Sequence, residues 1–247
     1  MLVPSGAIAG ASAASLDLAR IVGAFGLAVP MPATVAAGLA TSIQRVIRVS
    51  AVRLFTRDDV AALGRELVTL LQVAARAAEP ADAALALYAA AAQASAAFPR
   101  SASPSLTRDY ALARSLAASI ETACLGEAFL AEARTTFGNR QSATAARERI
   151  GAALDAARDR IAGALGEVVS VILASAAREA SGHLVRLGAD LQPVIRVATT
   201  TSVPSSALAW SLYADPARAE DLVARNRVGT PLFMPTSIEA LSPQDRL

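Results

Sequence analysis

The 247-residue sequence contains no lysine, because all 23 basic residues are arginine. Mechanisms that need a catalytic lysine, or the lysine of a phosphate-binding loop, are therefore excluded. Only one cysteine, Cys124, and one histidine, His183, are present. Neither a disulfide within the chain nor a zinc site with three or four cysteine or histidine ligands can form. We therefore expect no metal, no cofactor and no catalytic residues.

The net charge of +2 conceals an uneven distribution of arginine. Up to Arg57 the chain has five arginines and a single acid, and the local basic excess consists of Arg45, Arg48, Arg53 and Arg57. Two or three phosphate contacts from these side chains would give weak, salt-sensitive nucleic-acid binding. We favour the alternative that they form a solvated or partner-facing helix flank.

Alanine dominates the apolar residues, with 61 alanines against 72 larger apolar side chains. Alanine is the best helix former but buries little surface. The composition therefore predicts a mainly α-helical protein whose helices pack closely through small residues. The larger apolar residues then serve as seams between helices and between subunits, and they do not indicate one thick core around an active site.

One uncharged stretch, 21–44, is long enough to span a membrane. Pro30 and Pro32 lie near its middle, however, and the first sixteen residues lack the charged start of a signal peptide. We expect two short apolar helices that are separated at 29–32. Burial against another subunit is favoured over insertion into lipid.

Helix signals continue to about residue 190. Thr56 and Asp59 form a capping box before an apolar helical face, and Pro80 ends that helix. We predict helices over 57–78, 83–98, 105–137 and 142–188. The last of these has a seam in which large and small residues alternate: Ile150, Leu154, Ala157, Ile161, Ala164, Val168, Val171 and Ser175. This seam is equally compatible with a helical hairpin within the chain and with a self-associating helix in an oligomer.

The segment 191–247 differs in composition, because it holds six of the 12 prolines and the only tryptophan. Its pattern predicts a strand at 193–201, helices at 207–213 and 217–225, an apolar loop at 230–235 and a closing strand at 237–241. We therefore expect two regions, a helical assembly region (1–190) and a small βααβ module (191–247). The module is too small to bury much surface alone and should lean on the helical region or on a neighbouring chain.

Helical spacing places Trp210, Tyr213 and Leu222 in the core of this module. Asn226 is expected to cap a helix or fix the following turn. Phe233 and Met234 lie between Pro231 and Pro235 and are the best interface candidates, because apolar residues there are costly to leave exposed.

The run from Val203 to Pro235 resembles the C-terminal part of the Mu-like phage tail proteins called DNA circulation, or circularisation, proteins. The matching residues are Leu208, Ala209, Leu212, Tyr213, Asp215, Arg218, Asp221 (or Glu220 beside it), Leu222, Asn226, Pro231, Phe233 and Pro235. The same pattern is similar to a degenerate LysM fold of phage baseplate proteins. Two departures are the turn, where Ala214 replaces the family's glycine, and Thr236-Ser237, where the family has a glycine before the last strand. The N-terminal domain of mixed strand character that is usual in the family has no counterpart in this sequence.

The resemblance implies a structural, non-enzymatic component of a phage or phage-like tail, at the baseplate or its junction with the tube. Such a protein would form a homo-oligomer, contact other tail and baseplate proteins, assemble in the bacterial host cytoplasm and reside in the virion. Two alternatives remain open. One is a DNA-end-binding protein that acts through the basic residues above, and the other is a LysM-type module that binds cell-wall glycan.

Overall fold

The computed structural model describes residues 5–243, which are mainly helical and include a small two-stranded sheet. These residues form two compact units. Unit 1 contains the described residues up to Thr136 together with Arg147–His183. Unit 2 contains Phe137–Ala146 and the described residues from Leu184 onward. The predicted mainly α-helical fold is confirmed, and the units share the two helices that connect them.

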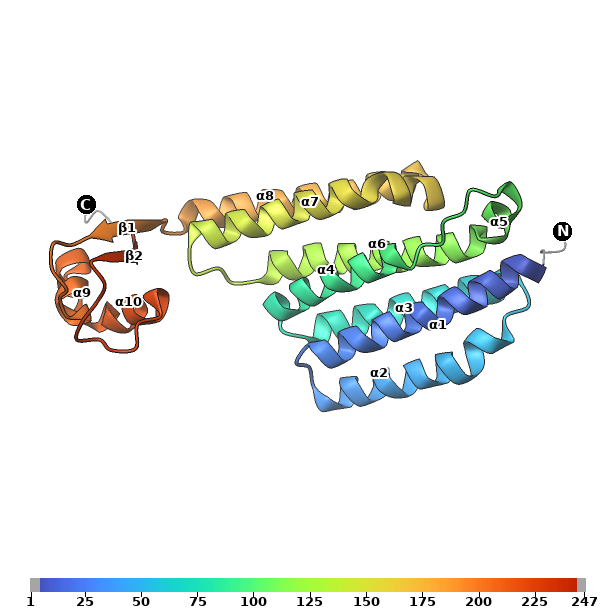
Figure 1. The fold of residues 1–247 in the computed structure, drawn as a ribbon, viewed down its shortest axis with the longest axis horizontal. Coiled ribbons are helices and arrows are strands. Elements are labelled where there is room, and N and C mark those ends of the chain that lie inside the picture. The colour runs from blue at the N-terminus through green and yellow to red at the C-terminus, as the bar shows by residue number, and fades with distance from the viewer. Residues whose placement is uncertain (1–4, 244–247) are drawn as a thin grey trace. The chain divides into compact units, whose positions relative to one another are not determined.

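Unit 1 is a stack of helices connected by short turns (Figure 1). A single π turn, Val46–Ser50, and a 3-10 turn, Ala51–Arg53, follow α2. The first eight α-helices are α1 Ser5–Ala28, α2 Ala33–Arg45, α3 Arg57–Ala77, α4 Pro80–Ala96, α5 Pro104–Asp109, α6 Ala111–Arg134, α7 Arg140–Leu165 and α8 Glu167–Asp190, the last two of which are divided between the units.

Local signals set several of these boundaries as the sequence predicts. The Thr56 hydroxyl accepts the amide of Asp59, and the Asp59 carboxylate accepts the amides of Phe55 and Thr56, which completes the capping box of α3. These hydrogen bonds lower the pKa of Asp59, with the Phe55 amide making the largest contribution. The break between the first two helices also falls where the prolines predict it, although α1 has 24 residues and is not short.

Helix α6 lies at the centre of unit 1 and packs against α1, α3 and α4. Small side chains allow the close approach. A Cβ added at Gly64 of α3 would lie 3.0 Å from Leu116 of α6, and one at Gly26 of α1 would overlap the side chain of Leu39 of α2. Many alanines of α3, α4 and α6 are also buried, in agreement with the predicted close packing through small residues.

The predicted continuous helix over 142–188 is wrong. Gly166 adopts a φ of +94°, a left-handed value that L side chains rarely adopt, and it reverses the chain between α7 and α8. The Arg140 guanidinium donates to the carbonyl of Gly188, so the start of α7 lies beside the end of α8 in an antiparallel hairpin. The predicted helix over 105–137 is likewise divided, because α5 ends before Tyr110 and α6 begins after it.

The seam divides at the same glycine. On α7, Ile150, Ala157 and Ile161 are buried, whereas Val168 and Val171 on α8 are exposed. Within the chain, residues of the first half of the seam are thus buried, and Val168 and Val171 of the second half lie on the surface.

Unit 2 has the predicted order of strand, helix, helix and strand. Its elements are β1 Val194–Ala198, α9 Ser205–Tyr213, a 3-10 turn at Pro216–Arg218, α10 Ala219–Asn226 and β2 Ser237–Leu241. The strands pair antiparallel, with Arg196 opposite Glu239. Six buried residues form the core: Leu208, Ala209, Leu222, Met234, Ile238 and Ala240.

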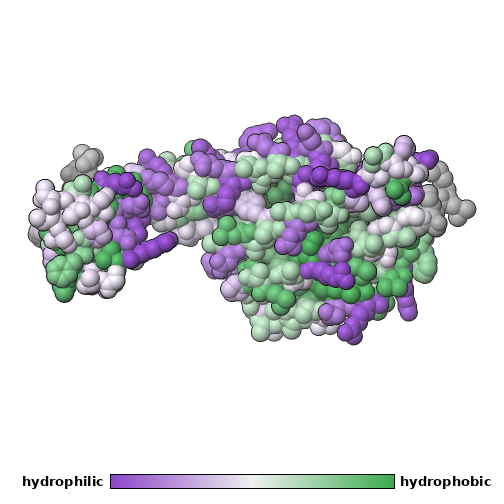
Figure 2. All heavy atoms as spheres, viewed as in Figure 1, coloured by the Kyte–Doolittle hydropathy of each residue, from purple (hydrophilic) through white to green (hydrophobic). Residues whose placement is uncertain are grey.

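Three helical segments have the length and hydropathy that would allow them to cross a bilayer: Gly6–Ala28, Ala33–Arg53 and Glu167–Asp190. On the visible face of unit 1, charged and apolar residues are mixed (Figure 2).

Candidate functional site

The loop between α10 and β2 exposes two neighbouring apolar side chains. Leu232 and Phe233 are 60% and 68% exposed, whereas Met234 is 1% exposed. The prediction that Met234 is an interface residue is wrong, because its side chain belongs to the core that contains Leu222 and Ile238. Leu232 and Phe233 therefore remain as the candidate docking residues of this loop.

Three hydrogen bonds hold this loop against the segment that leads into α9. The amide of Ser205 donates to the carbonyl of Pro231 at 2.7 Å, and the amide of Met234 donates to that of Val203 at 3.1 Å. The hydroxyl of Ser202 also donates to the carbonyl of Met234 at 2.7 Å. Leu232 and Phe233 are thus presented between two fixed anchor points, which lowers the ordering cost of binding a partner.

Trp210 is 62% exposed, so its predicted place in the core is wrong. The buried face of α9 carries Leu208 and Ala209, and the adjacent position 210 points away from that face. Leu222 is fully buried, which confirms its predicted core position. Tyr213 is partly buried, and its hydroxyl donates to the carbonyl of Leu241.

The Arg218 guanidinium lies 3.8 Å from the centroid of the Tyr213 ring, within the range of a cation–π contact. Burial raises the pKa of Tyr213, and the positive charge of Arg218 opposes this increase. This contact ties the 3-10 turn to α9 and covers one face of the Tyr213 ring.

Asn226 connects α10 to β2. Its side-chain amide donates to the carbonyls of Leu222 and Glu239, and its side-chain oxygen accepts the amide of Glu239 at 2.8 Å. Asn226 was predicted to cap a helix or fix the following turn; the bond to the Leu222 carbonyl fits the first role, and no bond to the following turn is formed within the described residues. Its main partner, however, is the backbone of the distant strand, which local sequence does not reveal.

The four arginines of the basic excess do not form one free cluster. Arg45 pairs with Glu66 of α3, which neutralises part of the excess. Arg48, Arg53 and Arg57 are exposed and come from the π turn, the 3-10 turn and the start of α3. Exposed apolar residues lie between them in the chain, namely Val49, Val52 and Phe55.

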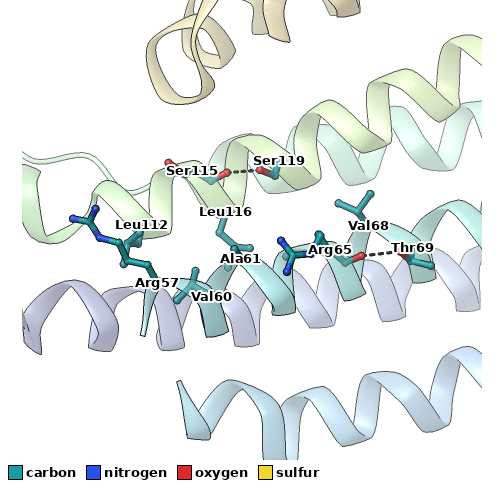
Figure 3. Close-up of a pocket in the computed structure, with 11 residues that line it drawn as sticks. Arg57, Val60, Ala61, Arg65, Val68, Thr69, Leu112, Ser115, Leu116 and Ser119 are labelled. Atoms are coloured by element: carbon teal, nitrogen blue, oxygen red, sulfur yellow. Dashed lines mark hydrogen bonds between the residues drawn. The ribbon is translucent and has the colours of Figure 1, made fainter. Parts of the chain in front are cut away.

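Sequence reasoning missed a groove over α6. A cavity of about 500 Å³ lies between α3 and α6 (Figure 3), and a second one of about 510 Å³ lies between α3, α6 and α8. Val68 and Ser119 line both cavities. The lining residues have ordinary helical spacing in the sequence. The groove can therefore be recognised only once α3, α6 and α8 are placed together.

Three buried glutamates of α6 were also missed. Glu121, Glu127 and Glu132 are at most 6% exposed. Each pairs with an arginine of another helix: Glu121 with Arg160, Glu127 with Arg76 and Glu132 with Arg149. Buried charges need such partners, so these pairs fix how α3 and α7 sit on α6.

The remaining titratable groups of note lie inside the helical packing. Burial raises the pKa of Cys124 to about 12, and the nearby Glu121 adds to the increase. His183 is partly buried on α8. Within residues 5–243, no three side chains of histidine, cysteine, aspartate or glutamate gather where they could hold a metal ion.

A comparison with protein-family models finds no match, and no curated protein is significantly similar to this chain.

Proposed function

We propose that this protein is a structural component of a phage or phage-like tail, at the baseplate or the tail hub. Its helical unit associates with other helices, and its small C-terminal unit docks onto neighbouring tail proteins. The protein acts by binding and positioning, without a catalytic step. The resemblance of 203–235 to the DNA circulation proteins supplies the biological setting of this proposal.

The exposed pair Leu232 and Phe233 carries the docking part of the proposal. Two large apolar side chains stand on the surface of a loop that three backbone-directed hydrogen bonds anchor. An aromatic and an aliphatic side chain presented in this way are typical anchors of a protein interface. The buried Met234 ties the same loop to the core, so the anchors are displayed at a fixed position.

The arrangement of unit 2 is compatible with the proposed LysM-like identity. Two helices connect antiparallel strands, and one core contains residues from both helices and β2. Ala214 stands where the resembling family has glycine and takes a left-handed φ of 53°. The turn thus keeps the conformation that a glycine would favour, although the glycine itself is absent.

The docking proposal is tested by co-sedimentation of the full chain with purified tail particles. The double variant Leu232→Ser and Phe233→Ser should lose most of its co-sedimentation, and Trp210→Ser should keep it. Trp210 is an apt control because it has similar exposure and lies in the same unit. Equal binding of the double variant and the unmodified chain would contradict docking through this loop.

Cell-wall glycan binding is a second candidate function, which the exposed indole of Trp210 favours. An exposed aromatic face with a polar N–H suits a ligand that is partly apolar and partly wet. A peptidoglycan pull-down that Trp210→Ala abolishes, and that the Leu232 and Phe233 changes leave intact, would favour this function over tail docking.

DNA-end binding depends on Arg48, Arg53 and Arg57, since Arg45 is paired with Glu66. With about three phosphate contacts, affinity should fall with a slope near −3 on a logarithmic salt scale. A gel shift that does not weaken with salt, or no shift at all, argues against this alternative.

A further inference from the structure

The two cavities over α6 form one groove, because they share Val68 and Ser119. We call it the α6 groove. Its floor runs along α6 from Leu112 to Glu127, and its walls are α3 and, over part of its length, α8. At about 1.5 Å per residue the floor is about 22 Å long, which matches roughly four turns of a helix.

The floor of the α6 groove carries hydroxyl groups and Glu127, but these polar groups already have partners within the chain: the Glu127 carboxylate pairs with Arg76 of α3. Ser115, Ser119 and Thr122 each donate to the carbonyl four residues earlier in α6, at 3.1, 2.7 and 2.7 Å (Figure 3 shows the Ser119 bond). Their donor capacity is therefore used within the helix. A Cβ added at Gly126 would meet nothing within 4 Å, so the floor is open there. An apolar helix face can pack on such a floor without leaving the hydroxyl donors unpaired.

An apolar ridge lies beside this groove. Val168, Val171 and Ile172 of α8 are 73%, 55% and 64% exposed. Their spacing places them on one face of α8. Val168 and Val171 belong to the exposed half of the seam described above. We call these three residues the α8 ridge. Ile172 also lines the α6 groove, so the ridge and the groove are continuous.

The charges beside the ridge and the groove are complementary. Exposed Arg57 and Arg65 line the α3 side of the groove, and neither makes an ion pair within residues 5–243. Glu167 precedes the ridge on α8, and its ion pair within residues 5–243 is a 3.9 Å contact with Arg158 in which both side chains are exposed. Exposed pairs of this kind contribute little, so Glu167 is free to pair elsewhere.

We propose that the α6 groove binds the α8 ridge of a second copy of this chain, in a two-fold symmetric dimer. Because the ridge and the groove meet at Ile172, a two-fold axis near this residue places each ridge in the groove of the other copy. The same patch on both subunits is what a two-fold interface requires. Glu167 of one copy then approaches the free arginines of the other. This inference rests on the proposed function, in which the helical unit associates, and it names the surface that does so.

The test is the oligomeric state of the full chain by sedimentation velocity over a range of concentrations. Ile172→Glu places a charge in the interface and should weaken dimerisation by about 100-fold or more. Gly126→Leu fills the open floor, where an added side chain meets no neighbour, and should weaken it similarly. Leu27→Glu is the matched control, because Leu27 is 90% exposed and lies on α1, away from the groove.

A charge exchange tests the orientation. Arg65→Glu and Glu167→Arg should each weaken the dimer, and the two changes in one chain should restore most of the lost affinity. A monomeric unmodified chain, a dimer that survives Ile172→Glu and Gly126→Leu, or equal loss in Leu27→Glu would overturn the inference. If the unmodified chain is monomeric and still sediments with tail particles, only this inference fails, and the proposed function stands.

Discussion

At the scale of single residues, Asn226 is the most connected polar side chain of unit 2. It makes two hydrogen bonds to the backbone of Glu239 and one to Leu222. Asn226→Ala leaves the amide and carbonyl of Glu239 without these partners, so it should lower the free energy of unfolding by about 2–3 kcal/mol. Urea denaturation followed by circular dichroism measures this change. A loss below 0.5 kcal/mol, roughly the effect of an ordinary surface substitution, would show that the strand does not need this link.

Ala214 permits the opposite prediction at the same scale. Its left-handed φ of 53° is strained for alanine and unstrained for glycine. Ala214→Gly should therefore raise the free energy of unfolding by about 0.5–1 kcal/mol. The thermal midpoint of the full chain measures this, and Ala217→Gly, in the neighbouring turn, is a control that should not raise it. A lower midpoint for Ala214→Gly would contradict the strain argument.

At the scale of elements, Gly166 decides whether α7 and α8 are one helix or two. Its φ of +94° is unfavourable for any residue with a Cβ, although nothing crowds the site. Gly166→Ala should lower the stability of unit 1 by about 1–2 kcal/mol through backbone strain alone. Gly163→Ala, three residues earlier in α7 and equally uncrowded, should raise stability by up to about 1 kcal/mol. Equal effects of the two substitutions, measured by denaturant unfolding, would show that the turn is not set by this residue.

One of the two ion pairs between α6 and α7, in which only the carboxylate is buried, is a second element-scale test. Glu132 is 1% exposed and accepts a 2.8 Å hydrogen bond from Arg149. Arg149→Ala leaves a buried carboxylate without its partner and should cost on the order of 3 kcal/mol. Replacing both residues by leucine should recover most of this loss. If the double replacement is as unstable as Arg149→Ala, desolvation of the lone carboxylate is not the cause.

The elements also show how far sequence reasoning reaches. The capping box predicted the start of α3, because that signal acts within a few residues. The start of α4 was predicted three residues too late, because Pro80 lies in its first turn instead of only ending α3. The periodic apolar pattern across Gly166 predicted a continuous helix, because periodicity does not register the φ of one glycine. Trp210 was misplaced for a related reason, since helical spacing fixes which residues share a face but not which face is buried. The α6 groove and the buried glutamates depend on three helices meeting, so no local pattern could predict them.

At the scale of the whole molecule, the packing explains the composition. Alanine and glycine let the helices of unit 1 approach closely, so few large side chains suffice to fill the seams between them. Among the apolar residues that remain exposed are the three of the α8 ridge and the pair Leu232 and Phe233. The α8 ridge lies beside the α6 groove in unit 1, and Leu232 and Phe233 lie on the anchored loop of unit 2. With the proposed roles, one surface for a second copy and another for neighbouring proteins, the molecule would be suited to assembly.

The reactivity of Cys124, the single cysteine, measures whether unit 1 is folded. Burial raises the pKa of Cys124 from 9.0 to about 12 in the folded state. In the unfolded chain the thiol ionises near its ordinary pKa, so the folded state loses stability as the pH rises from about 9 towards 12, and below pH 9 this contribution is fully present. The raised pKa of Tyr88, which is due mainly to burial, acts in the same direction.

We expect Cys124 to resist a disulfide reagent at pH 8 and to react at the rate of unfolding, with both unfolding and labelling accelerating above about pH 9–10. Cys124→Ala should reduce the alkaline loss of stability measured by urea titration at pH 8 and pH 10. Fast labelling of the native chain at pH 8 would contradict a sealed helical interior, because only an open α6 would expose this thiol.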